Sequence, residues 1–433
     1  MYKKSKYLYY YKEDDVYVLY STKTGTIAIM ESDETKDIDT IINNDTFGIK
    51  EININLFNEL LKYDFIIDYN TNEEKDVVEK INSYLKNSKT FSSTVFITNQ
   101  CNFNCGYCFV KKNIESISST TIDKLYLLYN KMSDAYEELH ISWFGGEPLL
   151  ELEKMITINT NLHSICNIKG RNLKSSVVTN GYLLTLRNFL KMYDAGINEI
   201  QVTLDENSII HNKYRTHITD GATFNTIIDN LRAISKCNRN DFHIRIRCNY
   251  FNKSIDKIDE CVEIYKKYFQ NDNRFSFTIK PIVNYDSNDP KELITTYIGT
   301  VGSVTNFILK YPELNTEFSG VLMPKRKWCS FYGSNTVVIN NIGNIYSCDS
   351  TINNDDYLIG YIDESGSIIY NDKYNELLYD EIFRCLKCNR YPICVGSCPR
   401  IYYKVKNKAC YCTETEIINF LSALYKIETN GRI

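Results

Sequence analysis

The sequence lacks the features that would place the protein in a membrane or on nucleic acid. Its 433 residues include no apolar run of about 18 residues, the length that a membrane-spanning helix needs. The first residues are charged, and no apolar segment with a small-residue cleavage site follows them, as a secretory signal would require. Basic residues are not in surplus, because 50 Lys and Arg accompany 54 Asp and Glu and the net charge is −4. We therefore expect a cytoplasmic protein without a membrane or nucleic-acid partner.

Cysteine is absent from the first 90 residues and abundant after them. The chain has 15 cysteines, and in a secreted chain this number would indicate a disulfide framework. Because no secretion signal is found and most of the cysteines form two tight groups, metal binding is the better interpretation. The chain is long enough for two or three domains.

The cysteine-free segment has its own pattern of strands and helices. Strand-like runs at residues 7–11, 16–20 and 26–30 are separated by charged or turn-forming residues. Apolar spacing then predicts helices around residues 56–61 and 77–85, with a strand at 65–67 between them. We expect a small α+β module with a separate core over residues 1–90.

Strand-like and helical patterns alternate from residue 94 to about 281. The strand candidates are residues 94–98, 138–143, 175–179, 199–204 and 243–249, and the helix candidates are residues 122–132, 186–192, 224–234 and 255–268. Repeated β–α units indicate parallel strands joined by crossover helices. We therefore expect an α/β fold with a partial (β/α)6 barrel over residues 91–285. A bridging region over 286–327 and a loop-rich, cysteine-dense segment over 328–433 follow it.

The first cysteine group directly follows the first strand candidate of the barrel. Cys101, Cys105 and Cys108 lie within eight residues at the carboxyl end of that strand, where α/β barrels carry their chemistry. Three thiolates can bind one face of a [4Fe–4S] cluster. No fourth cysteine is nearby, so one iron would keep an open position. The alternative is a zinc knuckle, which requires a fourth Cys or His close by.

The C-x3-C-x2-C spacing, with Tyr107 before the last cysteine, resembles the signature of the radical S-adenosylmethionine (SAM) superfamily. The resemblance implies that the open iron binds SAM and that an electron from the cluster cleaves SAM to a 5′-deoxyadenosyl radical. Further segments resemble the GGEP and TNG motifs of this family and its SAM-carboxylate arginine. The implied SAM-binding residues are Tyr107, Gly145, Gly146, Glu147, Pro148, Thr179, Asn180 and Arg215. A simple β-turn at GGEP and a surface ion pair at Arg215 are the alternatives.

The second cysteine group consists of Cys329, Cys348, Cys385, Cys388, Cys394, Cys398, Cys410 and Cys412. Its spacing resembles the SPASM extension of radical SAM enzymes that modify peptides and proteins. By the family pattern, Cys329, Cys348 and Cys398 bind a first auxiliary [4Fe–4S] cluster. A second auxiliary cluster is implied at Cys385, Cys388, Cys394 and either Cys410 or Cys412, with Cys412 preferred because it immediately precedes a predicted helix. The resemblance thus implies three [4Fe–4S] clusters and SAM, whereas a pair of zinc ribbons is the alternative.

Asp349, directly after Cys348, has two interpretations. In sulfatase-maturing members of the family an aspartate at the matching place acts as a general base, which makes Asp349 a candidate catalytic residue. A loop aspartate that binds nearby backbone is the more common case.

The N-terminal module resembles in layout the winged-helix domain that binds leader peptides in maturases of ribosomally made peptides. Such domains add the leader as a strand to a sheet edge. We therefore expect a radical SAM maturase that cross-links a precursor peptide, with an electron donor such as flavodoxin or ferredoxin. A Cys thioether is preferred, because residues 309–328 contain no cysteine and the first auxiliary cluster would keep an iron open for a substrate thiolate. The alternative is that the one of Cys410 and Cys412 that the second cluster does not use closes this site. The alternatives are a carbon–carbon link, an anaerobic sulfatase maturase and a non-catalytic zinc or electron-transfer protein.

Overall fold

The computed structural model describes most of the chain as two compact units. It describes all residues except 87, 113–114, 252–256, 284–299, 318–321, 326–328, 330–334, 375–384, 397, 406–409, 411–412 and 431–433. One unit consists of residues 1–86, 294–329 and 380–433, and the other consists of residues 87–293 and 330–379. We call them the first and second unit and consider each by itself.

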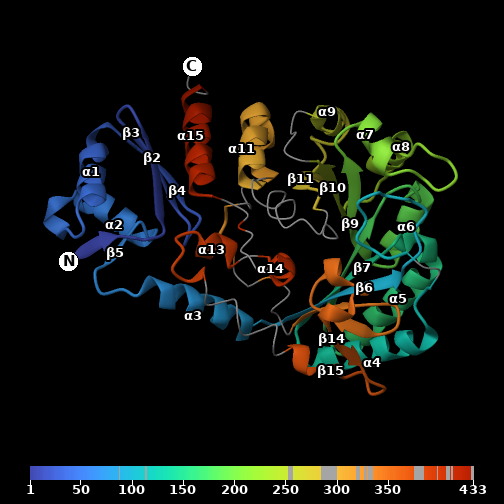
Figure 1. Cartoon of the computed structure of the whole chain (residues 1–433). Coiled ribbons are helices and arrows are strands. Elements are labelled where there is room, and N and C mark those ends of the chain that lie inside the picture. The colour runs from blue at the N-terminus through green and yellow to red at the C-terminus, as the bar shows by residue number, and fades with distance from the viewer. Residues whose placement is uncertain are drawn as a thin grey trace. The chain divides into compact units, whose positions relative to one another are not determined.

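Six parallel strands form the centre of the second unit (Figure 1). They are β6 (Thr90–Thr98), β7 (Glu138–Gly145), β8 (Asn172–Thr179), β9 (Ile197–Asp205), β10 (His243–Tyr250) and β11 (Phe275–Pro281). They lie side by side in chain order, and inward and outward side chains alternate along β7 and β8. The five strand candidates of the barrel all fall within observed strands, so the predicted repeat of β–α units is confirmed.

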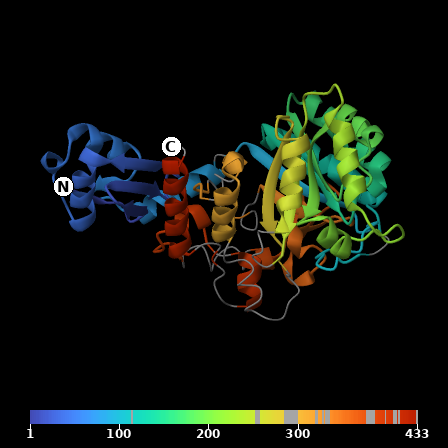
Figure 2. The same cartoon turned by 90° about the horizontal axis from the view of Figure 1, so that it is seen from above.

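The connecting helices cover the outer face of this curved sheet (Figures 1 and 2). They are α4 (Ser119–Ala135), α5 (Leu152–Ile168), α6 (Leu186–Asp194), α7 (Ser208–Tyr214), α8 (Phe224–Ser235) and α9 (Asp259–Tyr268). α5 was not predicted, although its buried residues recur on one face of a helix: Leu152, Met155, Ile158, Asn159, Leu162 and Cys166.

Four strands from the C-terminal part of the chain extend the same sheet. They are β12 (Thr336–Ile339), β13 (Asn344–Tyr346), β14 (Leu358–Ile362) and β15 (Ile368–Tyr370), with short 3-10 turns at Asp349–Thr351 and Asp355–Tyr357. β12 pairs in parallel with β6, and β13, β14 and β15 follow as antiparallel neighbours. Residues 330–379 belong to the compact unit that contains the barrel, whereas the sequence predicts a separate loop-rich segment over 328–433.

The first unit contains the N-terminal module. Its strands are β1 (Tyr2–Lys4), β2 (Leu8–Glu13), β3 (Val16–Ser21), β4 (Ile27–Glu31) and β5 (Ile66–Asp68), and its helices are α1 (Thr35–Asn43), α2 (Ile54–Lys62) and α3 (Glu73–Lys86). Short 3-10 turns of this module lie at Ser32–Glu34 and Ile49–Glu51. A further 3-10 turn, at Pro148–Glu151, belongs to the second unit. β2, β3 and β4 form an antiparallel sheet, and β1 pairs with β5. All the strands and helices that the sequence predicts for this module are present. β1 and α1 are additional elements that were not predicted.

Helices from the C-terminal half complete the first unit. They are α11 (Thr300–Lys310), α13 (Tyr391–Cys394), α14 (Pro399–Val405) and α15 (Glu414–Asn430), and a 3-10 turn spans Pro312–Glu317. α15 contacts β2, β3 and α11. The two units divide the chain at other positions than the four predicted segments do. The functional division into those four segments therefore stays a prediction.

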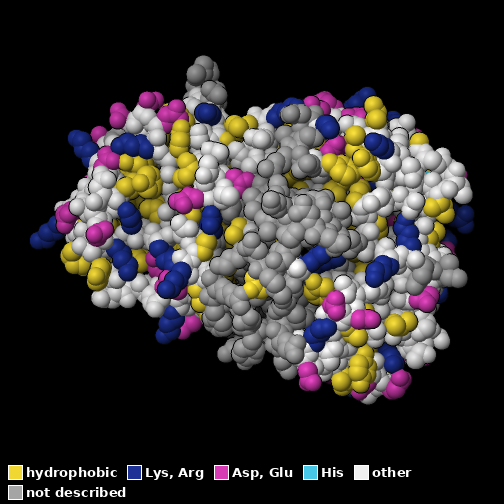
Figure 3. All heavy atoms as spheres, viewed as in Figure 1, with side chains coloured by type: hydrophobic (Ala, Val, Ile, Leu, Met, Phe, Trp, Pro, Cys, Tyr) yellow, Lys and Arg dark blue, Asp and Glu magenta, His cyan; other side chains and the backbone are white. Residues whose placement is uncertain are grey.

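Two further observations concern the charged surface and the helix lengths of the described residues. Basic and acidic side chains are interspersed on the face shown in Figure 3. Among the described residues, no helix has both the length and the apolar character to cross a membrane.

Candidate active site

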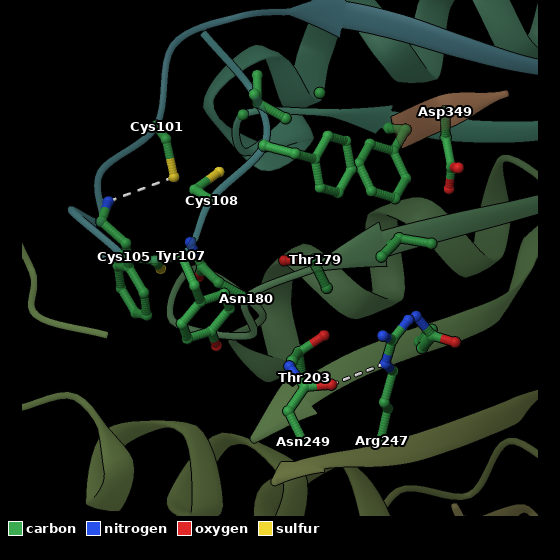
Figure 4. Close-up of a pocket in the computed structure, with 18 of the residues that line it drawn as sticks. Cys101, Cys105, Tyr107, Cys108, Thr179, Asn180, Thr203, Arg247, Asn249 and Asp349 are labelled. Atoms are coloured by element: carbon green, nitrogen blue, oxygen red, sulfur yellow. Dashed lines mark hydrogen bonds between the residues drawn. The ribbon is translucent and has the colours of Figure 1, made fainter. Parts of the chain in front are cut away.

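A cavity at the carboxyl ends of the barrel strands contains the first cysteine group (Figure 4). It encloses about 410 Å³. Its lining includes Cys101, Cys105 and Cys108 together with Gly145, Gly146, Thr179, Asn180, Tyr107, Arg215 and Asp349. The structure therefore gathers at one cavity the first cysteine group and most of the residues that the motifs singled out.

The cysteine loop connects β6 to α4. Burial raises the pKa of Cys101 to about 12, with a smaller contribution from the nearby Glu147 carboxylate. Burial also raises the pKa of Cys105, against the opposing effect of Arg215. Thiols in this environment stay protonated near neutral pH unless a metal ion displaces the proton.

The two glycines of the GGEP segment allow it to pack against the backbone that leads into the cysteine loop. A Cβ atom on Gly145 would lie 2.3 Å from Thr98 O, and one on Gly146 would lie 2.1 Å from Gln100 O. Gly146 N donates to Thr98 O at 2.9 Å. The absence of side chains at Gly145 and Gly146 thus permits a close approach between two segments of the chain itself.

Glu147 connects this segment to the end of β8. Its side chain is fully buried, and its carboxylate accepts hydrogen bonds from Thr179 Oγ1 at 2.7 Å, Asn180 N at 2.8 Å and Leu149 N at 3.0 Å. Burial raises the pKa of this carboxyl, and the hydrogen bonds oppose the rise. Pro148 begins the 3-10 turn that follows. The β-turn alternative does not account for these contacts, and the contact of Glu147 with an ammonium group of SAM stays a prediction.

Asn180 completes this connection by contacting the cysteine loop. Its side chain donates to Asn102 Oδ1 at 2.8 Å, and Asn102 itself is buried. The GGEP and TNG segments are therefore bound to the cysteine loop and to each other, so the three motifs form one hydrogen-bonded assembly.

Arg215 lies inside the protein and not in a surface ion pair. It is 6% exposed, and its Nη1 donates to the Tyr107 hydroxyl at 3.0 Å. The same hydroxyl lies 2.7 Å from each carboxylate oxygen of the buried Asp205. The Nε of Arg215 is buried and has no hydrogen-bond partner among the described residues. An unpaired guanidinium donor beside this cavity fits a carboxylate ligand.

Asp205 and Asn249 were not among the predicted site residues. Asn249 donates to Asp205 Oδ1 at 3.3 Å and accepts from Arg247 Nε at 2.9 Å. Arg247 and Asn249 line the cavity with Gln201 and Thr203. A sequence signal for these two residues is the row of polar residues at alternate positions of β9 and β10. Because alternate residues of a strand face the same side, such a row indicates a shared polar face.

His211 connects the end of β9 to Arg215 and is neutral in the fold. Its Nδ1 accepts from Asp205 N at 3.2 Å, and its Nε2 lies 3.0 Å from Thr223 Oγ1. Thr223 Oγ1 donates to Arg215 O at 2.8 Å. Burial, with a further contribution from Arg215, lowers the pKa of His211 to about 2.

His211 is therefore expected to make the fold sensitive to acid. An unfolded histidine binds a proton below about pH 6.5, whereas the folded one does not until near pH 2. The contribution of His211 is complete above pH 6.5, and it falls by about 1.4 kcal/mol per pH unit as the pH decreases. Urea unfolding of the wild type and of His211→Asn between pH 7 and pH 5 measures this slope. The His211→Asn variant should lose most of this pH dependence of the unfolding free energy. Equal slopes in the two proteins would contradict the conclusion that His211 is neutral in the fold.

Asp349 lines the cavity on the side away from Cys101 (Figure 4). Its Oδ1 accepts from Ser350 N at 2.7 Å and lies 3.3 Å from Cys348 Sγ. Both interpretations thus keep support, because the carboxylate binds its own loop and also faces the cavity.

The second cysteine group is divided between the two units. Cys329, Cys385, Cys388, Cys394, Cys398 and Cys410 lie in the first unit, Cys348 lies in the second, and Cys412 is outside the described residues. Cys388 N donates to Cys385 O at 2.9 Å, and burial raises the pKa of Cys398 to about 11. Among the described residues, no three His, Cys, Asp or Glu side chains are arranged to bind a single metal ion. The auxiliary ligand sets stay predictions.

Residues 95–246 match the model of the radical SAM superfamily. This segment covers the cysteine loop, the GGEP and TNG segments and Arg215. Residues 95–246 therefore form a radical SAM domain, and a domain of this family implies a [4Fe–4S] cluster and SAM. Three cysteines at one cavity and the unpaired Arg215 Nε fit these two groups.

Known proteins similar to this chain include peptide- and protein-modifying enzymes. The cysteine-type anaerobic sulfatase-maturating enzyme of Clostridium novyi (strain NT) is 26% identical over 333 residues, which cover 70% of this chain and 86% of that protein. The structure of anSMEcpe with bound AdoMet and the Cp18Cys peptide has a TM-score of 0.59 at 19% identity, covering 79% of this chain and 98% of that chain. The structure of Streptococcus suis SuiB bound to precursor peptide SuiA has a TM-score of 0.50 at 16% identity, covering 95% and 98%. At these identities the two structures are similar to this chain in fold alone.

Proposed function

We propose that this enzyme modifies a genetically encoded precursor peptide by abstracting a hydrogen atom from it and installing a cross-link. The observation that carries the proposal is the extent of the shared fold. The fold of SuiB, which was crystallised with a precursor peptide, covers 95% of this chain, whereas that of anSMEcpe covers 79%. The larger coverage supports a precursor peptide as the substrate.

The residues of the cavity have distinct proposed roles. Cys101, Cys105 and Cys108 bind the cluster, and the buried Arg215 binds the carboxylate of SAM through its unpaired Nε. When bound, the cluster and SAM supply the 5′-deoxyadenosyl radical that abstracts the hydrogen atom. Tyr107 and Asp205 position the Arg215 guanidinium through the Tyr107 hydroxyl.

Polar side chains of the cavity support a peptide substrate. Ser142, Gln201, Thr203 and Arg247 line it alongside the apolar Ile282 and Val283. Amide, hydroxyl and guanidinium groups can bind the carbonyl and N–H groups of a peptide backbone, and the apolar residues can contact a side chain.

The N-terminal module is proposed to bind the leader of the precursor. β4 is an edge strand of the sheet β2-β3-β4, and its first residue, Ile27, is 40% exposed. An extended peptide can add to such an edge through main-chain hydrogen bonds. This arrangement supports leader binding by strand addition at β4.

A thioether is the cross-link that the cysteine pattern favours. Cys329, Cys348 and Cys398 are the evident ligands that would hold the first auxiliary cluster, which would supply an open iron for a substrate thiolate that has released its proton. Hydrogen abstraction gives a substrate carbon radical and 5′-deoxyadenosine. Bond formation between sulfur and carbon then leaves one electron, for which the auxiliary cluster would supply the acceptor. One hydrogen atom, one proton and one electron are thus removed in total.

The identity of the cross-link can be tested on a candidate precursor encoded by a neighbouring small open reading frame. Incubation with enzyme, SAM and reductant is expected to give a product lighter by two hydrogens whose cysteine no longer reacts with iodoacetamide. Mass spectrometry with and without alkylation measures both properties. The same mass with an alkylatable cysteine would indicate a carbon–carbon link and contradict the thioether.

A sulfatase maturase is the second candidate function. It is favoured by the Clostridium novyi relative and by the position of Asp349 at the cavity. The same assay distinguishes it, because oxidation of a cysteine to formylglycine gives an aldehyde without sulfur at that position.

A further inference from the structure

The N-terminal module and the cysteine-rich segment 385–395 share one hydrophobic core within the first unit. This core consists of Tyr7, Val77 and Ile81 from the module with Tyr391 and Val395 from the segment, and Cys385, Leu386 and Cys388 pack against it. Two proposed ligands of the second auxiliary cluster therefore lie directly against the module.

Hydrogen bonds from the module fix the backbone of this segment. Thr22 Oγ1 donates to Asn389 O at 2.7 Å, and Lys6 Nζ donates to Leu386 O at 3.4 Å. Glu74 orients the Lys6 amine by accepting from it at 2.6 Å. Both acceptors on the segment are main-chain carbonyl groups, so these bonds restrain the loop that joins Cys385 to Cys388 and the residues after it.

Tyr7 is placed in this core with its backbone fixed and its hydroxyl unpaired. Tyr7 O accepts from Thr22 N at 2.9 Å, and Tyr7 N donates to Ser5 Oγ at 3.1 Å. The side chain is 0% exposed, and its hydroxyl has no hydrogen-bond partner among the described residues. Burying a hydroxyl without an acceptor is unfavourable, and the ring packs in the same core as two cysteines. The Tyr7 ring thus lies in the core against which Cys385 and Cys388 pack, and its hydroxyl has no acceptor among the described residues.

We propose that the Tyr7 hydroxyl donates a hydrogen bond to a cysteine sulfur or inorganic sulfide of the second auxiliary cluster. The inference rests on the proposed assignment of that cluster to Cys385, Cys388 and Cys394. Hydrogen bonds to sulfur are among the factors that set the reduction potential of iron–sulfur clusters. A donor at this position stabilises the more negative, reduced cluster and so raises its potential. The N-terminal module then has a role in electron transfer besides leader binding, and Tyr7 acts as a positioning residue through the sulfur.

A redox titration of the full-length chain tests this inference. The background is the Cys101/Cys105/Cys108→Ala variant, which should contain the two auxiliary clusters alone with about eight iron atoms. In this background Tyr7→Phe keeps the ring that packs the core and removes only the hydroxyl. Tyr17→Phe is the matched control, because Tyr17 is 3% exposed, belongs to the other core of the module and has a hydroxyl bonded to Asp39. Electron paramagnetic resonance monitors each cluster.

The expected result is a more negative midpoint potential for one of the two clusters in Tyr7→Phe and no shift in Tyr17→Phe. Loss of about four iron atoms from Tyr7→Phe alone would support the same contact through retention of the cluster. Unchanged midpoints with about eight iron atoms bound overturn the role of Tyr7 and leave the cluster assignment intact. A background variant with about four iron atoms or none overturns the cluster assignment, and the role of Tyr7 with it.

Discussion

Replacing Cys101, Cys105 and Cys108 together with alanine is expected to abolish 5′-deoxyadenosine formation. Alanine cannot bind iron, and these are the three cysteines at the cavity that contains Arg215 and the glycines of the GGEP segment. Three [4Fe–4S] clusters correspond to about twelve iron atoms per chain, so the variant should keep about eight. Iron and sulfide assays with chromatographic detection of 5′-deoxyadenosine under dithionite measure both effects.

The control for this experiment is Cys166→Ala. Cys166 is buried in α5 and contacts Ser133 at 3.6 Å, and it does not line the cavity. This variant should keep about twelve iron atoms and the SAM cleavage of the wild type. Cleavage of SAM by the triple variant would show that the catalytic cluster has been assigned to the wrong cysteines.

The second large effect is expected from Gly146→Ala. The added methyl group would lie 2.1 Å from Gln100 O and 2.7 Å from Asn99 O. Both atoms belong to the backbone, so no side-chain rotation relieves the overlap, and overpacking of this kind costs about 1–3 kcal/mol. The shift is transmitted to Cys101, and a displacement of about 1 Å near reacting groups costs about 100-fold in rate. We expect 5′-deoxyadenosine formation to fall by about 100-fold or more.

Gly48→Ala is the matched control for Gly146→Ala. Gly48 has a backbone conformation open to other residues (φ −97°), and an added Cβ would meet only the carboxylate of Glu51, at 3.2 Å. That side chain can move, so SAM cleavage should stay near the wild-type rate. A Gly146→Ala enzyme as active as Gly48→Ala would contradict the close packing of the GGEP segment on the cysteine loop.

The barrel could be predicted from sequence because its signals are local. Each strand candidate has β-branched residues in a short run, and each helix candidate has apolar residues at helical spacing. The pairing of β12 with β6 had no such signal, since a strand of four residues acquires a partner only through tertiary packing. The helix α5 was missed although its buried face follows helical spacing.

The sequence predicted which residues belong to the site better than it predicted the hydrogen bonds between them. The motifs identify Glu147 and Arg215, but their spacing does not show that Glu147 accepts from Thr179 and Asn180 or that Arg215 donates to Tyr107. Asp205 and Asn249 belong to rows of polar residues at alternate strand positions, but a polar residue near a strand end gives no indication of its partner. The shared core of Tyr7 and Tyr391 joins residues from opposite ends of the sequence, and a pattern within one segment cannot reveal it.

The pairing of β12 with β6 also has a consequence for protein synthesis. β6 is made early, and the strand that covers its outer edge is made only after the other five strands of the barrel. Until β12 emerges from the ribosome, an apolar strand with free backbone groups is exposed, and such an edge promotes association between chains. Chains that terminate before residue 336 should therefore aggregate, and full-length yield should increase when a chaperone that binds extended apolar segments is abundant.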